Sequence, residues 1–184
     1  MQRTLVEAAQ AGDHDAFEVL AAAAVDRLYA IARLVLHDAH DAEDAVQDAL
    51  VNAWRHLPSL RDPNRWDAWL RRLLLNVCMD EGRHRRRFEA TVRLLREEPS
   101  EPDAAALLAD REQLERGFRR LKPEHRVAIV LHYYVGLPFA EIAETLGIPV
   151  GTAKSRVHYA TELLRAGLEA DAREPSHATN GRSA

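Results

Sequence analysis

The sequence predicts an all-α protein made of two small helical domains that are joined by an acidic linker. Three observations favour this fold class. Apolar residues recur at helical spacing through most of the chain. No segment shows the extended alternation of apolar and polar residues that marks a half-buried strand. Near the middle, the acidic and proline-bearing run 97–103 has too few large apolar side chains to fold alone, and it reads as a flexible linker.

The first half of the chain is expected to form three helices. The second helix opens at Asp41 and ends near Pro58, and the third runs from about Trp66 into the basic run 83–87. Between them, residues 62–64 read Asp-Pro-Asn, which is a turn signal. The residues expected to face the core are Leu28, Ile31, Ala32, Val35 and Leu36 in the first helix, Ala45, Val46, Ala49, Leu50 and Trp54 in the second, and Trp69, Leu70, Leu73, Leu74 and Val77 in the third. For Trp66, a core position and an exposed stacking position are both open.

The sharpest local signal is a helix-turn-helix pattern that begins at residue 139. A short helix with Ile142, Ala143 and Leu146 inward is expected to stop at Gly147, which can take a positive φ. Pro149 then stands at the start of the next helix, where its missing N–H does no harm.

That second helix, over about 150–168, has an apolar stripe on one side and polar and cationic residues on the other. Such a face suits base-edge hydrogen bonds and phosphate contacts in a DNA groove. The alternative is an ordinary surface helix with solvated charges, and the preceding turn favours DNA binding. The expected inward residues are Val150, Ala153, Val157, Ala160 and Leu164, and the candidate DNA-binding residues are Thr152, Lys154, Ser155, Arg156, His158 and Tyr159.

The net charge of −4 argues against a nucleic-acid partner when it is taken alone, but its distribution reverses the argument. Residues 61–96 carry a net charge of +5 and residues 119–168 carry +3, with acidic stretches before and between them. Because salt confines a surface field to about 10 Å, local basic faces decide whether phosphates are attracted.

Other features narrow the class of protein. The single cysteine, Cys78, excludes an intramolecular disulfide, no apolar run is long enough for a membrane span, and the N-terminus lacks the apolar core of a signal peptide. We expect a cytoplasmic protein without membrane insertion. The sequence holds no P-loop, no HExxH pattern and no nucleophile motif, so we expect no enzyme, no cofactor and no small-molecule substrate. His37 and His40 are spaced for one helix face, but without a third ligand we favour solvated histidines over a metal site.

Four segments together resemble extracytoplasmic-function (ECF) sigma factors, the small initiation factors of bacterial RNA polymerase. Residues 38–54 resemble the family's polymerase-binding helix, 80–87 its basic promoter-melting segment, and 121–126 the entry to its second domain. Residues 137–164 resemble its minus-thirty-five reader, with 149–156 very close to the usual run. The resemblance covers about residues 12–168 in the right order. It implies sigma region 2 at 1–88 and sigma region 4 at 112–172, on either side of the linker at 89–111. The tail at 173–184 is polar and small in its residues, so we expect it to be disordered.

The resemblance also implies roles for particular residues. A loop at 60–64 would cradle a flipped minus-ten base, with Asn76 as a base reader. Core RNA polymerase and promoter DNA are the implied partners, together with an anti-sigma factor. The implied core-polymerase-binding residues are Asp41, Glu43, Asp44, Gln47 and Asp48, and the implied minus-ten DNA-binding residues are Arg61, Asn64, Asn76, Arg83, Arg85, Arg86 and Arg87.

Purely structural explanations of the same residues remain open. The acidic residues also read as a solvated face, the arginine run as a helix end, and Asn76 as the donor of a hydrogen bond to its own helix. The linker is either a tether or a mimic of nucleic acid inside the polymerase channels. Tyr159 and Thr161 stand where many relatives carry a base-reading arginine and a bulky or basic residue, so the promoter sequence is not determined.

Two rival functions fit parts of the pattern. A conventional helix-turn-helix regulator, with a ligand-binding or dimerising first half, would bind duplex DNA unaided, whereas a sigma factor needs core polymerase. An adaptor that holds polymerase without reading DNA would tolerate replacement of Thr152, Ser155 and His158.

Overall fold

The computed structural model describes residues 1–92 and 114–173, and for 82–92 and 169–173 it describes the backbone alone. Every regular element in these ranges is helical, which confirms the predicted all-α fold class. The predicted linker falls largely on residues 93–113 and the predicted tail on 174–184, and both segments lie outside the described residues.

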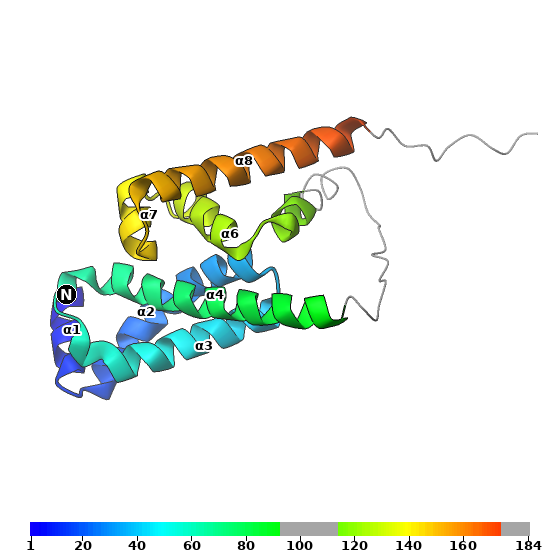
Figure 1. Ribbon diagram of the computed structural model, residues 1–184. Helices are drawn as coiled ribbons and strands as arrows, with labels where there is room; N and C mark the ends of the chain where they lie inside the picture. The colour runs from blue at the N-terminus through cyan, green and yellow to red at the C-terminus, as the bar shows by residue number, and fades with distance from the viewer. Residues whose placement is uncertain (93–113, 174–184) are drawn as a thin grey trace, which may run out of the picture.

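The first layer consists of four helices and two single turns. They are α1 (Gln2–Gln10), α2 (His14–Leu36), α3 (Ala39–His56), the 3₁₀ turns η1 (Leu57–Ser59) and η2 (Pro63–Arg65), and α4 (Trp66–Val92). Helices α2, α3 and α4 pack against one another, and α1 packs on α2 at one end of the bundle (Figure 1). Gln10 of α1 donates hydrogen bonds to the carbonyls of Leu57 and Leu60, at 3.1 and 2.7 Å, and so holds the loop that leads to α4.

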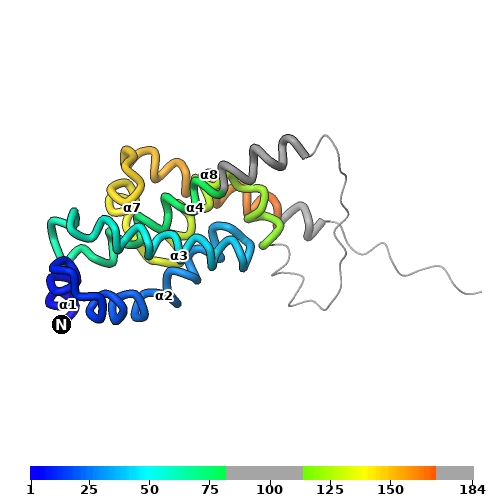
Figure 2. Tube along the Cα trace, turned by 90° about the horizontal axis from the view of Figure 1, so that it is seen from below, coloured from blue at the N-terminus to red at the C-terminus, as the bar shows by residue number. Residues whose placement is uncertain are grey.

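The second layer lies on α2 and α4. It begins with a helix over residues 114–120 and continues with α6 (Pro123–Ile129), the π-helical turn η3 (Val130–Tyr134), α7 (Phe139–Leu146) and α8 (Val150–Arg173). Helix α6 contacts both α2 and α4, and α7 contacts α4. Helix α8 runs along the outer side of this layer (Figure 1), and Figure 2 gives a second view of the two layers, turned by 90°.

One continuous hydrophobic core joins the two layers. Leu28, Ile31 and Leu70 of the first layer belong to the same cluster as Leu121 and Leu131 of the second. Arg126 of α6 reinforces the junction, because its guanidinium donates to the carbonyl of Val35 at 2.7 Å and to that of Leu121 at 3.0 Å.

Most predicted core positions are buried, but Leu50, Trp54, Leu73, Val77 and Leu146 are only half-buried. Trp66 is 1% exposed and is a core residue, and Trp69, which was expected in the core, is half-buried and packs against it. Val150 is 43% exposed instead of buried, because it is the first residue of α8 and lies beyond the reach of the apolar stripe. All five residues predicted inward on the first helix are buried.

Some helix boundaries differ from those expected. Helix α3 begins at Ala39, two residues before Asp41, because the Asp38 carboxylate caps it by accepting from the backbone N–H groups of His40 and Asp41. Helix α4 continues past the expected limit at residue 88 to Val92, and α8 continues past 168 to Arg173. The expected turn at 62–64 is the 3₁₀ turn η2, which Asp62 caps.

Candidate polymerase and nucleic-acid interfaces

The outer face of α3 carries most of the predicted polymerase-binding residues. Ala42, Ala45, Val46, Ala49 and Ala53 are buried, so the opposite side of the helix faces away from the core. Glu43, Asp44, Gln47 and Asp48 are exposed there, and Asp41 is half-buried near the helix start. The structure therefore brings four of the five predicted residues together on one accessible surface.

One residue of this face was not expected. Val51 is 47% exposed and stands one turn after Gln47 and Asp48, which places an apolar side chain within the acidic surface. A protein-binding surface commonly combines an apolar centre with a charged rim. The sequence could have indicated this residue, because Val51 interrupts the polar pattern of this helix face at a spacing of three and four residues from Asp48 and Gln47.

The loop before α4 and the exposed face of α4 form a second surface. Arg61, Asn64 and Asn76 are all exposed, as a DNA-contacting role requires. The side-chain amide and the backbone N–H of Asn64 both donate to the Asp62 carboxylate at 3.0 Å, so this residue shapes the loop. Of the remaining predicted minus-ten residues, Arg83, Arg85, Arg86 and Arg87 lie on the α4 backbone, and their side chains are outside the described residues.

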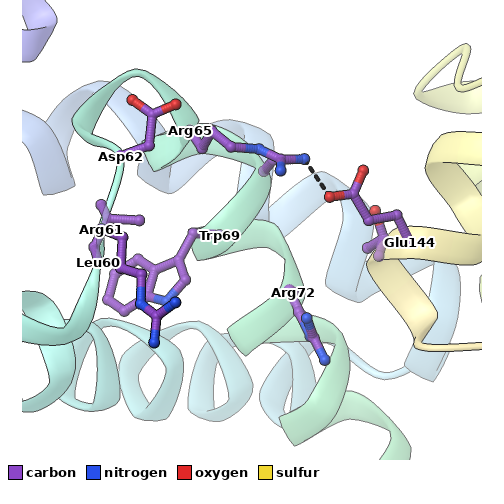
Figure 3. A pocket seen from close by; sticks show the side chains of 9 residues that line it. Leu60, Arg61, Asp62, Arg65, Trp69, Arg72 and Glu144 are labelled. Carbon is purple, nitrogen blue, oxygen red and sulfur yellow. Dashed lines mark hydrogen bonds and ion pairs between the residues drawn. The ribbon is translucent and has the colours of Figure 1, made fainter.

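A cleft of about 300 Å³ opens beside this loop (Figure 3). Arg61, Arg65 and Arg72 line it together with Trp69, and Glu144 of α7 closes one side. A half-buried indole among three guanidinium groups suits a ligand that has both a flat ring and a negative charge. Arg65, Trp69 and Arg72 were not among the predicted site residues, because their convergence depends on the packing of α4 beside the loop.

The helix-turn-helix has the predicted turn. Gly147 ends α7 with φ 64°, in the left-handed region, and the N–H of Ile148 donates back to the carbonyl of Ala143 at 3.0 Å. The carbonyl of Pro149 then accepts the first hydrogen bonds of α8, from Thr152 at 2.9 Å and from Ala153 at 3.1 Å.

The polar face of α8 is open to solvent. Its buried stripe is made of Ala153, Val157, Ala160 and Leu164, as predicted. On the other side, Lys154, Ser155, His158 and Tyr159 are exposed, and Thr152 and Arg156 are half-exposed. All six candidate minus-thirty-five residues are therefore described and accessible.

Neighbouring side chains orient parts of this face. The Nζ atom of Lys154 lies 5.9 Å from the ring centre of Phe139, a cation–π contact that holds the ammonium beside α7. Phe139 in turn stacks on His132 at 4.6 Å. The hydroxyl of Ser155 donates to the carbonyl of Thr152 at 3.0 Å, and the hydroxyl of Thr161 donates to that of Val157 at 2.8 Å, so both hydroxyl protons are used within α8.

Two titratable groups with shifted pKa values, the half-buried His37 and the buried Cys78, lie away from these surfaces. Burial lowers the pKa of His37 to about 4, and the positive charges of Arg126, Arg119 and Arg33 lower it further. His37 ends α2 in the left-handed conformation with φ 61° and packs on Phe118, which corrects the expectation of a solvated side chain. Burial raises the pKa of the Cys78 thiol to about 12.

Among the residues that the structure describes, no group of three histidine, cysteine or carboxylate side chains could hold a metal ion. His40 is exposed, and its Nε2 lies 3.8 Å from a carboxylate oxygen of Asp44. His37, in contrast, is half-buried. Within the same ranges, none of the helices has the length and apolar character needed to cross a membrane.

Comparison with known proteins gives two family matches that cover both layers. Residues 20–88 match the model of sigma-70 region 2, and residues 111–164 match that of sigma-70 region 4. The ECF RNA polymerase sigma factor SigL of Mycobacterium tuberculosis is 39% identical over 136 residues, which span 72% of this chain and 77% of that relative.

Solved structures give the same picture of the fold. The structure of CnrH in complex with the cytosolic domain of CnrY aligns with a TM-score of 0.65 and 32% identity, over 92% of this chain and 98% of that one. The sigma factor RpoE from Bartonella quintana, solved with the anti-sigma factor NepR, also aligns with a TM-score of 0.65, at 26% identity over 84% of this chain and 98% of that one. With both sigma regions matched in order and at this level of identity, the chain belongs to the ECF family of RNA polymerase sigma factors.

Proposed function

We propose that this chain directs core RNA polymerase to specific promoters and starts transcription there, with α3 on the polymerase, the α4 surface on the minus-ten element and α8 on the minus-thirty-five element. The observation that carries the proposal is the pairing, in one chain of this family, of an accessible acidic helix with an accessible recognition helix. A regulator or an adaptor would use only one of the two.

The acidic surface of α3 supports docking on a basic partner. Asp44 and Asp48 are exposed one turn apart, and like charges at this spacing destabilise a helix slightly unless a partner neutralises them. The exposed Val51 adds apolar contact area in the same place. The corresponding partner surface on core polymerase would be basic at its rim and apolar at its centre.

The α4 surface supports recognition of unpaired bases. Asn76 is exposed and offers both a donor and an acceptor, which can pair with the edge of an extruded base. Trp69 supplies a ring for stacking, and the arginines around it neutralise phosphates. The Arg83–Arg87 run extends this basic surface along the sequence and is proposed to assist melting.

The α8 surface supports reading of the duplex. Lys154 and Arg156 are proposed to contact phosphates, and Thr152, Ser155, His158 and Tyr159 are proposed to contact the bases. Since Tyr159 replaces a base-reading arginine that is common in the family, the promoter preference of this protein should differ from that of arginine-bearing relatives.

Further elements of the proposal concern the protein's surroundings. Polymerase carries out the chemistry of RNA synthesis, and this chain is proposed to act without a catalytic step of its own. Its site of action is the cytoplasm, because core polymerase and the chromosome are there. An anti-sigma factor is the proposed regulator, in keeping with the sigma–anti-sigma complex to which the fold is similar.

Run-off transcription tests the proposal directly. Purified core polymerase is supplied with a pool of genomic promoter fragments, with and without this protein. We expect new, defined start sites that are weakened at least about ten-fold by Asn76→Ala, in line with the loss of one bidentate base contact. Glu18→Ala, at an exposed residue of α2 that belongs to none of the proposed surfaces, is the control and should leave initiation unchanged.

The rival functions give different results in the same assay. A conventional regulator would produce no new start sites but would shift specific duplex fragments without polymerase. An adaptor would bind polymerase and yet initiate equally well after replacement of Thr152, Ser155 and His158 together.

A further inference from the structure

A pocket of about 370 Å³ lies between α2, α4 and the π-helical turn η3. Its volume falls within the range of small-molecule sites in proteins, about 300–1,000 Å³. The second layer contributes Tyr134, the last residue of η3, and Val135, which follows it. Single π-helical turns occur frequently at functional sites. None of the residues that line the pocket belongs to the surfaces proposed for polymerase and DNA, so its size and setting point to a separate ligand.

The inner wall of the pocket is apolar and fixed in place. Leu28, Ile31 and Leu70 line it, and each is at most 3% exposed. All three belong to the continuous core, and Val135 packs against the same core. Because this wall is already formed, a ligand with a hydrocarbon chain or ring would remove apolar surface from water without reordering the protein.

Arg71 of α4 lines the pocket with a half-buried guanidinium group that lacks a direct partner in the described part of the chain. Among those residues its buried Nε atom finds no hydrogen-bond acceptor, and the group forms no ion pair. Burial lowers the pKa of Arg71, and the charges of Asp67 and Glu141 offset this effect only in part. A charge withdrawn from water without a partner is unfavourable. An anion that enters the pocket therefore gains a strong, charge-assisted hydrogen bond.

The charges around the pocket favour an anion with a single negative charge. The one carboxylate in its lining, Asp67, is already engaged, because it accepts from Nη2 of Arg27 at 2.6 Å and from Nε2 of Gln2 at 3.1 Å. Two arginines against one aspartate leave the lining with a net charge of +1. A carboxylate would balance this charge, whereas a phosphate monoester, with nearly two negative charges, would leave an excess beside Asp67. The hydroxyl of Tyr134 can supply a second donor to the carboxylate.

We propose that this pocket binds a small monocarboxylate with an apolar body, whose carboxylate lies on Arg71 and Tyr134 and whose chain or ring lies on Leu28, Ile31 and Leu70. The bound molecule would contact α2 and α4 of the first layer and η3 of the second, so that binding stabilises their junction. The protein then has a small-molecule ligand in addition to its macromolecular partners. The inference is independent of the proposed function, because binding of the carboxylate requires neither polymerase nor DNA.

Isothermal titration calorimetry of the full-length protein with four probes tests the chemistry of the ligand. Octanoate should bind at one site with a dissociation constant on the order of 1 mM or lower, and it should raise the midpoint of thermal unfolding. Acetate lacks the apolar body and 1-octanol lacks the charge, so each should bind at least about ten-fold more weakly. Octyl phosphate, with its additional charge, should also bind more weakly than octanoate.

Variants then test the location of the site. Arg71→Met keeps the apolar bulk and removes the guanidinium, so it should weaken octanoate binding at least about ten-fold, and Tyr134→Phe should weaken it about two- to ten-fold. Arg55→Met, at an exposed arginine of α3, is the control and should change nothing.

Far-UV circular dichroism establishes that each variant is folded, and the probe series on the unmodified protein depends on no variant. The inference is overturned if octanoate shows no saturable binding in the millimolar range, or if acetate, 1-octanol or octyl phosphate binds as tightly as octanoate. Octanoate binding by folded Arg71→Met that equals binding by the unmodified protein would also overturn it.

Discussion

The ring of Tyr159 lies against the ring of His125, with centroids 4.6 Å apart and planes inclined by 44°. Tyr159 belongs to the recognition helix α8 and His125 to the supporting helix α6. The tyrosine remains 51% exposed, so part of its ring contacts His125 while the rest is accessible to solvent. The orientation of a proposed base-contacting side chain is therefore set by a residue that is 34 positions earlier in the sequence.

Replacing His125 by alanine is expected to relax the minus-thirty-five preference without abolishing initiation. Aromatic contacts contribute about 0.5–1.5 kcal/mol, so discrimination at the affected base pairs should fall by about two- to ten-fold. Run-off transcription from a promoter library randomised at this element measures the preference. Tyr133→Ala, at another exposed tyrosine, is the control. An unaltered preference in His125→Ala would show that the ring contact does not orient Tyr159.

Reversing charges on α3 is expected to weaken the complex with core polymerase. The double substitution Asp44→Lys and Asp48→Lys should raise the dissociation constant by about ten-fold or more at low salt, and the difference should shrink as salt screens the charges. Titration of labelled protein with core polymerase at two salt concentrations gives both values. Asp26→Lys, at an exposed aspartate of α2, is the control. Equal affinities for the double variant and the control would contradict docking through this face.

Acidification is expected to destabilise the protein through His37. Its pKa is lowered to about 4 in the folded protein and is about 6.5 in the unfolded chain. Between these pH values the unfolded state therefore binds more protons than the folded state. The contribution of the neutral His37 to the free energy of unfolding is fully present above pH 6.5 and is lost as the pH falls toward 4. The loss should be on the order of 1 kcal/mol between pH 7 and pH 5, since the side chain is partly exposed.

Urea unfolding at several pH values measures this effect. The reference is His37→Asn, because asparagine tolerates the left-handed backbone conformation and does not titrate. The variant should lose less stability on acidification than the unmodified protein. Parallel pH curves would assign the acid sensitivity to other groups.

Removing the Arg126 guanidinium is expected to destabilise the contact between the two layers. Arg126→Gln leaves the carbonyls of Val35 and Leu121 without these donors, so the free energy of unfolding should fall by about 1–3 kcal/mol. Urea unfolding followed by circular dichroism measures the change. Arg120→Gln, at an exposed arginine nearby, should change stability by less than about 0.5 kcal/mol. A similar loss in both variants would contradict the role of Arg126.

Much of the fold could be predicted because its signals are local. The register of the first predicted helix, the stop at Gly147 and the stripe on α8 all follow from periodicity and from the backbone preferences of glycine and proline. Helix α1 was missed, since its nine residues bury only Val6 and Ala9 and give a weak pattern. Val150 was placed wrongly because periodicity does not tell where a packed face ends.

The cleft could not be predicted, because its parts come together only through tertiary packing. Arg65 and Glu144 are 79 residues apart, and no sequence pattern links the two residues. Conversely, Arg83–Arg87 stood out in the sequence as a charge run, and their side chains lie outside the described residues. Local patterns identified the helices that carry the interfaces, whereas the contacts between the two halves required the structure.

The continuous core that joins the two layers has a consequence for how such a protein evolves. Leu28 and Leu70 of one half share their surroundings with Leu121 and Leu131 of the other. A mutation that alters the shape of one half therefore changes the selective value of mutations in the other. A chimera that exchanges one half for that of a distant relative is therefore expected to pack poorly across the shared core.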